Sequence, residues 1–287
     1  MTTQLAAAVG AALGAAAVEL RSIAGGDINQ AFRADLADGR RVFVKHRPDA
    51  PAGMFGAEAQ GLDWLRVAGG PRVPEVVAVR DEAPAFLALE WIDRGSPAAD
   101  HDEALGRGLA VVHAAGAASF GLAYDNFIAT VPQPNAPTST WPEFYATRRL
   151  EPLVRRCAED GRLRSATVAR VTRLVDRLED LCGPAEPPAR LHGDLWGGNA
   201  IVDASGSPVL IDPAVYGGHR EMDLAMMRLF GGFSPRVFDA YHESFPLAAG
   251  HEDRVGLWQL WPLLVHVALF GGSYAGSLDR TLGRYVG

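Results

Sequence analysis

The sequence predicts an α+β fold with two lobes, a small lobe built on an antiparallel β-sheet and a larger, mainly helical lobe after it. Three observations predict it. Short runs of alternating polarity concentrate in the first third of the chain, helical periodicities dominate the remainder, and a break rich in Gly and Pro at residues 94–97 separates the two. A chain of 287 residues suits one two-lobed unit or two modest domains. We therefore expect an N-terminal lobe over residues 1–93 and a C-terminal lobe over residues 94–287.

The small lobe is expected to hold two helices and two β-hairpins. The apolar opening predicts a helix rather than a signal sequence, because no Lys or Arg precedes it and Glu19 lies inside the pattern. Polar and apolar residues alternate on both sides of Asp38-Gly39, a pair typical of hairpin turns. In chain order we expect a helix at 5–18, strands near 25–35 and 41–45, a helix at 55–68, and strands at 73–79 and 85–91.

The larger lobe is expected to be helical apart from one short hairpin. The stretch from Leu260 to Tyr274 is the most apolar of the chain, but Pro262 and His266 interrupt it, and it is shorter than the roughly 20 residues of a membrane span. We expect a buried helix there and no membrane association. The other predicted elements are helices at 104–117, 141–156 and 165–181, a Pro-rich loop at 130–140, and two short strands around Ile201 and Leu210.

Charge and cysteine content exclude several classes of protein. The formal net charge is −7 and the sequence pI is about 5.6, so no basic field favours nucleic acid. Cys157 and Cys182 lack the spacing of a zinc site or a disulfide framework. We therefore expect a cytoplasmic protein that does not bind nucleic acid. No heptad or self-pairing surface is apparent, and a monomer is the default expectation.

The residues most informative about chemistry lie between positions 191 and 213. Asp194 is followed five residues later by Asn199, and Asp212 ends the second strand of the next short hairpin. Phosphoryl transfer needs a carboxylate that orients a hydroxyl and accepts its proton, and it needs hard oxygen ligands that hold Mg²⁺ against phosphates. The spacing of Asp194 and Asn199 is that of a kinase catalytic loop. Asp194 suits the role of the base, and Asn199 and Asp212 suit the metal.

Two further residues upstream match the order of a kinase small lobe. Lys45 ends a predicted strand, where its ammonium could reach the α- and β-phosphates of a nucleotide, and Glu58 lies on the following helix and could pair with it. Gly25 and Gly26 precede a strand and would let backbone N–H groups approach phosphate oxygens, although a full G-x-G-x-x-G pattern is absent.

With these residues in place, the chain resembles the fructosamine kinase (ketosamine-3-kinase) family, within the larger group of aminoglycoside-phosphotransferase-like and protein-kinase-like enzymes. The most discriminating stretch runs from Asp212 to Met226. The others are Gly-Gly-Asp-Ile-Asn at 25–29, Phe43-Val44-Lys45, Phe55 to Leu65, Leu89 to Ile92, Phe120-Gly121 through Asp125-Asn126, Pro132-Gln133, and Leu191 to Asn199. Together they cover nearly the whole chain.

The resemblance implies a bilobal protein-kinase-like fold and ATP-dependent phosphorylation of the 3-hydroxyl of a ketosamine, the rearranged adduct of a reducing sugar with an amine. The phosphorylated adduct then breaks down spontaneously. By the same resemblance Asp194 is the base and Asn199 and Asp212 bind Mg²⁺. Lys45 and Glu58 orient the phosphates, and Glu90, Trp91 and Ile92 form the hinge that binds adenine. Pro213-Ala214 follows Asp212 in place of Phe-Gly, which argues against a flipping switch of the protein-kinase type.

Several other residues have two interpretations at this stage. Trp196 either stacks on a sugar or fixes the loop as a wedge, and Tyr216 is a candidate substrate contact. Asp223 and His192 are expected to brace the catalytic loop. The charged run 219–221 is either a solvated loop or part of the substrate site.

Two alternative functions stay open on the sequence alone. The first is a kinase for another small hydroxylated acceptor such as an aminoglycoside, choline or a thioribose. The second is a catalytically silent pseudokinase that acts as a nucleotide-binding module.

Overall fold

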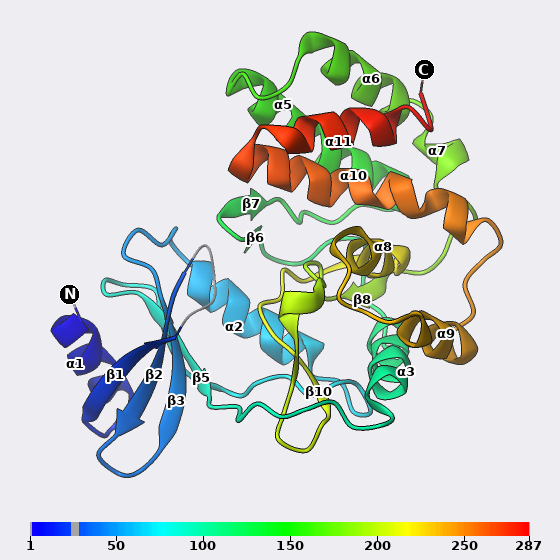
Figure 1. Cartoon of the computed structure of the whole chain (residues 1–287). Helices are drawn as coiled ribbons and strands as arrows, with labels where there is room; N and C mark the ends of the chain where they lie inside the picture. The colour runs from blue at the N-terminus through cyan, green and yellow to red at the C-terminus, as the bar shows by residue number, and fades with distance from the viewer. Residues whose placement is uncertain (1, 24–28, 287) are drawn as a thin grey trace.

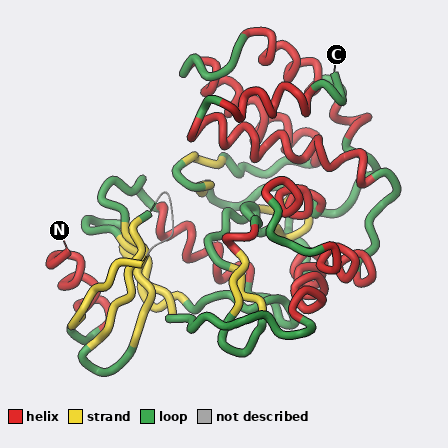
Figure 2. Tube along the Cα trace, in the orientation of Figure 1, coloured by secondary structure: helices red, strands yellow, loops and turns green. Residues whose placement is uncertain are grey.

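The computed structural model describes residues 2–23 and 29–286 and confirms the predicted α+β fold (Figure 1). The small lobe is a five-stranded antiparallel sheet in the order β1-β2-β3-β5-β4. Figure 2 shows that most helices gather in the second lobe. The elements of the small lobe are α1 (Thr2–Leu13), β1 (Ala17–Ile23), β2 (Gln30–Leu36), β3 (Arg41–His46), α2 (Met54–Leu65), β4 (Val76–Arg80) and β5 (Phe86–Glu90).

The two faces of this sheet pack against different helices. Because side chains alternate along a strand, Val44 on β3 points to the same core as α1, whereas the next residue, Lys45, lies on the other face. On β5, Phe86 packs with α1, and Leu87 packs with the buried residues of α2. Helix α2 lies between the sheet and the large lobe (Figure 1). Strand alternation therefore directs Lys45 towards the interior of the molecule.

The opening helix is shorter than the sequence predicts. Helix α1 ends at Leu13, and Gly14 adopts a left-handed φ of 68°, a conformation that favours glycine and ends helices. Residues 17–23, of which the first two were expected to be helical, form β1, which pairs with β2. The pairing partners lie up to 19 residues away, from Ala17 to Leu36, so local hydrophobicity could not reveal this edge strand.

The large lobe is mainly helical, as predicted, with three two-stranded sheets. Its helices are α3 (His101–Ala114), α4 (Trp141–Phe144), α5 (Glu151–Glu159), α6 (Ser165–Val175), α7 (Leu178–Leu181), α8 (Glu221–Phe230), α9 (Pro235–Ser244), α10 (His251–Phe270) and α11 (Ser273–Leu282). Its strands are β6 (Asn126–Ile128), β7 (Val131–Gln133), β8 (Ala189–Leu191), β9 (Ala200–Val202), β10 (Pro208–Leu210) and β11 (Tyr216–Gly218). A π-helical turn, η1 (Tyr145–Leu150), joins α4 to α5, and a 3-10 turn, η2 (Gly197–Asn199), precedes β9.

Several boundaries in this lobe correct the sequence-based expectations. The single helix expected at 141–156 is α4, η1 and α5, and the one expected at 165–181 is broken between α6 and α7. The loop expected at 130–140 contains β7, and the apolar helix expected at 260–274 is α10, which begins at His251 and ends before Gly271-Gly272. Three-residue strands are too short to produce a periodic pattern, which explains why β6, β7, β8 and β11 were missed.

The connection between the lobes is an irregular segment, residues 91–100, between β5 and α3. The predicted boundary at residues 93/94 falls within it. The backbone N–H of Gly95 donates to the carbonyl of Val202 on β9 at 3.1 Å, and the N–H of Leu210 on β10 donates to the carbonyl of Arg72 at 2.8 Å. The β9–β10 hairpin is therefore held between two segments that lie near the small lobe.

Both cysteines, Cys157 and Cys182, are buried and unpaired. Among the described residues, no helix combines the length and the apolar character that crossing a bilayer requires.

Candidate active site

Three of the predicted residues meet at the base of the β9–β10 hairpin. Asn199 ends η2 directly before β9, and its Nδ2 donates to the carbonyl oxygen of Asp194 at 2.8 Å. The same nitrogen lies 3.3 Å from Oδ2 of Asp194 and 3.5 Å from the carbonyl oxygen of Asp212. The carboxamide thus links the loop before the hairpin to the segment after it. With Nδ2 occupied in this way, the acceptor oxygen of Asn199 is the atom left for a cation.

Asp223, in the first turn of α8, holds the loop that carries Asp194. The carboxylate of Asp223 accepts the backbone N–H of His192 at 2.7 Å and that of Gly193 at 2.9 Å, and it contacts Nε2 of His113 at 3.1 Å. Burial alone would raise the pKa of Asp223, but these hydrogen-bond donors outweigh it and hold the pKa below its ordinary value. Asp223 therefore positions the loop as an anion, the bracing role expected from the sequence.

His192 and Gly193 fix the course of the same loop. Nδ1 of His192 accepts the N–H of Asp194 at 3.2 Å, so Nε2 carries the proton and donates it to the carbonyl of Ile211 at 3.0 Å. Burial lowers the pKa of His192 and favours this neutral form. Gly193 has a φ of 82°, and a Cβ there would collide with the carbonyl oxygen of Ala214. The loop therefore lies directly against the segment that follows Asp212.

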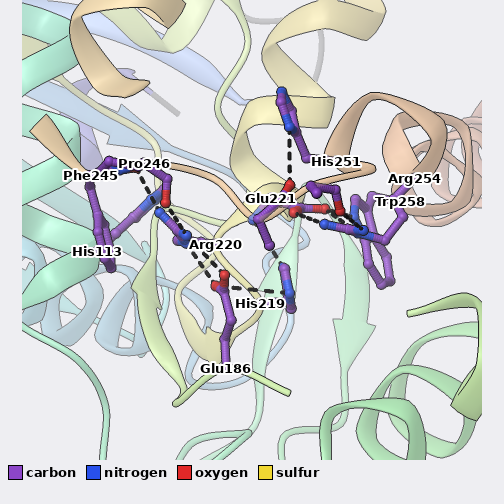
Figure 3. A network of polar contacts seen from close by, with 12 residues as sticks. His113, Glu186, His219, Arg220, Glu221, Phe245, Pro246, His251, Arg254 and Trp258 are labelled. Carbon is purple, nitrogen blue, oxygen red and sulfur yellow. Dashed lines mark hydrogen bonds and ion pairs between the residues drawn. The ribbon is translucent and has the colours of Figure 1, made fainter. Parts of the chain in front are cut away.

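Helix α8, which carries Asp223, is anchored at its start by buried ion pairs (Figure 3). Glu221 accepts from Arg254 at 2.6 and 2.9 Å and from Nε1 of Trp258 at 2.8 Å, both on α10. Arg220 donates to Glu186 at 2.7 and 2.8 Å. It also donates to the carbonyls of Phe245 and Pro246, each at 2.8 Å.

The charged run 219–221 is thereby placed in the interior. His219, Arg220 and Glu221 are all buried, and the ring of His219 stacks on that of Trp258. These three residues therefore form neither a solvated loop nor a substrate surface. They are part of the structural support for Asp223.

Lys45 connects the two lobes at the site. Its ammonium group donates to Oε1 of Glu58 on α2 at 2.6 Å and to Oδ1 of Asp212 at 2.7 Å, and its side chain is only 6% exposed. Burial alone would lower the pKa of Lys45, but the two carboxylates outweigh that effect and raise it. Lys45 is therefore a firmly charged ammonium between both carboxylates. Its pairing with Glu58 was predicted from the order of the residues, and its contact with Asp212 was not.

Asp212 adopts a backbone conformation that is rare for a residue with a side chain, with a φ of 54°. Its side chain is 42% exposed although Lys45 contacts it. A strained residue of this kind persists only where its surroundings hold it. Here the N–H of Ala214 donates to the carbonyl of His192 at 2.9 Å on one side of the segment.

A clamp of two buried amides, Asn126 on β6 and Gln133 on β7, holds the other side. Nδ2 of Asn126 donates to the carbonyl of Val215 at 2.8 Å, and Nε2 of Gln133 lies 3.3 Å from the carbonyl of Ala214. Gln133 and Asn135 both donate to Oδ1 of Asn126, at 3.1 and 2.8 Å. The segment after Asp212 is thus pinned on both sides, and the β6–β7 hairpin sets its position.

The carboxyl group of Asp194 has a raised pKa. Burial and then the nearby charge of Asp212 raise its pKa to about 7, although the amide of Asn199 acts in the opposite direction. A carboxylate whose pKa lies near neutrality is well matched to accept a proton from a hydroxyl group.

The donor atoms at this site fit a small, hard divalent cation. Mg²⁺ is usually held by one or two protein carboxylates or amides together with phosphates and water, rather than by a complete protein cage. Asp212 and Asn199 supply such oxygens. Among the described residues no cluster of three or more His, Cys, Asp or Glu side chains forms a metal cage.

The remaining predicted residues differ in how the structure places them. Glu90 ends β5, but its side chain accepts from Arg72 at 2.9 Å and from the N–H of Glu75 at 3.1 Å, so an adenine contact would have to come from the backbone. Trp91 and Ile92 follow it and are half-buried. Gly25 and Gly26 lie outside the described residues.

The two candidate substrate contacts have opposite environments. Trp196 is 43% exposed on the loop that carries Asp194, and its ring covers Gly198. Tyr216 is fully buried, stacks on Phe144 and lies under the guanidinium of Arg149 at 3.9 Å. Strand β11 places the ring of Tyr216 in the core of the large lobe, where it has no exposed surface to offer the predicted substrate contact.

Residues that the sequence did not assign also shape the site. Arg72 contacts Glu90 beside the predicted hinge and Asp203 in the turn of the β9–β10 hairpin, at 2.9 and 3.2 Å. Asn126 and Gln133 occur in the family-like strings, but no role could be given to them. A buried amide that supports a distant carbonyl leaves no local pattern in the sequence.

Comparisons with known proteins agree with this geometry. Residues 1–286 match the family model described as fructosamine kinase. The chain is 40% identical over 271 residues to a probable ketoamine kinase of Synechocystis sp., covering 92% of this chain and 89% of that protein. It is 37% identical over 262 residues to a probable ketoamine kinase of Enterococcus faecium, covering 91% and 92%.

Comparison with solved structures shows the same similarity in three dimensions. A Thermobifida fusca protein assigned as a fructosamine-3-kinase aligns with a TM-score of 0.89 and 46% identity over 98% of both chains. A macrolide 2'-phosphotransferase and the choline kinase of Streptococcus pneumoniae align over 97% and 98% of their own lengths with TM-scores of 0.61 and 0.63. They are only 17% and 13% identical, so they show the shared fold alone.

Proposed function

The chain belongs to the fructosamine kinase family, and from this premise we propose that it transfers the γ-phosphoryl group of ATP to the 3-hydroxyl of a ketosamine with Mg²⁺ as the metal. The observation that carries the proposal is the convergence of both lobes on one site. Lys45 contacts Glu58 and Asp212, and Asn199 contacts Asp194 and the backbone of Asp212.

The proposed mechanism assigns one task to each polar group. Asp194 orients the acceptor hydroxyl and accepts its proton while the hydroxyl oxygen attacks the γ-phosphorus and ADP leaves. Asp212 and Asn199 would hold Mg²⁺, which neutralises charge on the phosphates when bound. The backbone of Glu90 to Ile92 would bind adenine.

Lys45 must change partners in this mechanism. Without a nucleotide its ammonium contacts Asp212 at 2.7 Å, and the phosphate oxygens of ATP would replace that contact while Glu58 keeps its own at 2.6 Å. Glu58 thus holds Lys45 in place during the exchange.

The product explains why such a transfer would reverse glycation. A phosphate on carbon 3 lies next to the carbonyl at carbon 2 and β to carbon 1. Loss of a proton from carbon 1 gives a 1,2-enaminol, which expels phosphate from carbon 3. Water then hydrolyses the resulting C1=N bond and releases the amine. We propose this deglycation as the physiological outcome.

The acceptor is tested by measuring ATP consumption with a fructosamine, a ribulosamine, an aminoglycoside and choline, followed by NMR of the product. Phosphorus coupling to the proton on carbon 3 of a ketosamine is the expected result. Turnover on choline or the aminoglycoside alone would overturn the assignment of substrate, and nucleotide binding without transfer to any acceptor would indicate a pseudokinase.

Trp196 is proposed to stack on the sugar, since it is the exposed aromatic ring beside Asp194. Trp196→Leu is expected to raise the KM for the ketosamine by about 2- to 10-fold, because aromatic stacking contributes about 0.5–1.5 kcal/mol, and to leave the KM for ATP unchanged. Steady-state kinetics with each substrate varied in turn measure both constants. An equal rise in both would instead indicate that Trp196 supports the loop as a wedge.

The amide clamp predicts that its loss weakens metal binding as well as stability. Asn126→Leu removes one acceptor from each of Gln133 and Asn135 and frees the carbonyl of Val215, so we expect a stability loss of about 1–3 kcal/mol. We also expect a several-fold weaker affinity for Mn²⁺, a spectroscopic substitute for Mg²⁺, measured by electron paramagnetic resonance with a non-hydrolysable ATP analogue. The KM for the ketosamine should not change.

A matched control separates this effect from general destabilisation. Gln259→Met removes another amide that supports a backbone carbonyl, that of Ala225 on α8 at 3.0 Å. The control should lose stability and keep its Mn²⁺ affinity. Equal weakening of Mn²⁺ binding in both variants would contradict a specific role for the clamp.

A further inference from the structure

The basic residues of this chain are almost all arginines. Of the 27 lysine and arginine residues, one is a lysine, and that lysine is Lys45. Every other cationic side chain of this kind is a guanidinium, including all those in surface ion pairs. Apart from the α-amino group of the chain, whose residue lies outside the described part, Lys45 therefore carries the only primary amine in these 287 residues.

Primary amines are the groups on which ketosamines form. A neutral amine attacks the open-chain carbonyl of a reducing sugar, the N–C1 bond forms, and the carbonyl oxygen leaves as water. A hydrogen then moves from carbon 2 to carbon 1, so the ketosamine is an isomer of the first adduct and no oxidant is needed. The reaction requires an amine that is accessible and partly deprotonated. A guanidinium with a pKa above about 12 stays protonated at neutral pH and does not form this adduct.

Lys45 does not meet the requirement for accessibility. Its side chain is 6% exposed, and its ammonium donates at 2.6 and 2.7 Å to the carboxylates of Glu58 and Asp212. A nucleotide in the site would cover the same nitrogen with phosphate oxygens.

We propose that this chain is refractory to the sugar–amine condensation whose products it phosphorylates. The inference rests on the proposed function, because adducts on the chain are substrates of its own active site only if the protein is a ketosamine kinase. Without surface ε-amines, the enzyme neither accumulates ketosamines that would compete for its own active site nor loses Lys45 to a sugar.

Exposed arginines provide the comparison that tests this. Arg21, Arg107 and Arg156 are about half exposed, and each pairs at the surface with a carboxylate two or four residues away. A triple variant R21K/R107K/R156K keeps every charge and adds three accessible amines. Surface pairs of this type contribute little to stability, so the variant should keep its melting temperature and its turnover.

Both proteins are incubated with ribose at pH 8 and analysed by intact mass and peptide mapping. The original chain should gain pentose at most on its α-amine, and the variant should gain it at residues 21, 107 and 156 as well. The original should also retain its turnover. Pentose on Lys45, or as many adducts on the original as on the variant, would overturn the proposal.

A second step distinguishes failure of this inference from failure of the proposed function. Fresh original enzyme and Mg-ATP are added to the glycated variant, and phosphate on its peptides is measured. If adducts form as expected but none is phosphorylated, while the free ketosamines of the acceptor assay are also not phosphorylated, the function is wrong and the resistance stands. If free ketosamines are phosphorylated and Lys45 carries a sugar, the function stands and the resistance is wrong.

Discussion

Asp194→Asn is expected to lower kcat by about 10²- to 10⁴-fold while nucleotide affinity stays near its original value. The amide keeps the size of the carboxylate and can still contact Asn199, but it cannot accept a proton from the acceptor hydroxyl. Because Asp194 does not contact Lys45 or Glu58 by any described hydrogen bond, the groups proposed to hold the phosphates remain in place.

Single-turnover kinetics and nucleotide-induced thermal shifts measure the two quantities separately. A kcat within a few-fold of the original would show that the base is another group. Lost nucleotide binding at unchanged Tm would show that Asp194 belongs to the nucleotide site rather than to the acceptor side.

The same residue predicts a pH dependence. Because burial and Asp212 raise the pKa of Asp194 to about 7, the free enzyme should gain kcat/KM as pH rises through that region and the carboxyl group loses its proton. The pH dependence of the folding stability has the opposite sign. An acid whose pKa is raised by folding costs stability as pH rises from its unfolded pKa of 3.8 to its folded pKa of about 7, and the full cost remains above that, so Asp194→Asn should raise the Tm at pH 8 relative to the original chain. A lower Tm at pH 8 would contradict the raised pKa.

Asp212→Ala is expected to have the other large effect, a fall in kcat of at least about 10²-fold together with loss of the metal dependence of nucleotide binding. The substitution removes the proposed metal carboxylate and one of the two partners of Lys45. Glu58 still holds the ammonium at 2.6 Å, so the fold of the small lobe should persist.

Thermal shifts with ATP, in the presence and absence of Mg²⁺, test this directly. For the original chain the shift should be larger with Mg²⁺, and for the variant the two shifts should coincide. A variant that still shows the additional Mg²⁺-dependent shift would place the metal on other ligands. Asp212→Asn is a useful second variant, because it restores the shape of the side chain without its charge.

Much of the site followed from residue types and spacing. Asp194 and Asn199 lie on one loop five residues apart, and a two-stranded hairpin returns the chain to Asp212, so their proximity follows from short-range geometry. The pairing of Lys45 with Glu58 follows from a strand and a helix that are adjacent in the chain.

The residues that escaped prediction depend on distant partners. Strand β8 pairs with β11, which lies far along the chain. Three residues in each strand are too few to show the alternation of polar and apolar residues that predicts a strand. Asn126 supports a carbonyl 89 residues away. The run 219–221 looks solvated because it is charged, but Glu186 and Arg254 arrive from other elements and allow it to be buried.

The position of Lys45 between Glu58 and Asp212 has a practical consequence for spectroscopy. A sample labelled with nitrogen-15 only at lysine side chains would give a single ammonium resonance, already at the centre of the site. Exchange of Asp212 for a phosphate oxygen would change the chemical shift of that one signal. Occupancy of the nucleotide site could then be followed in real time, without assignment of any other resonance.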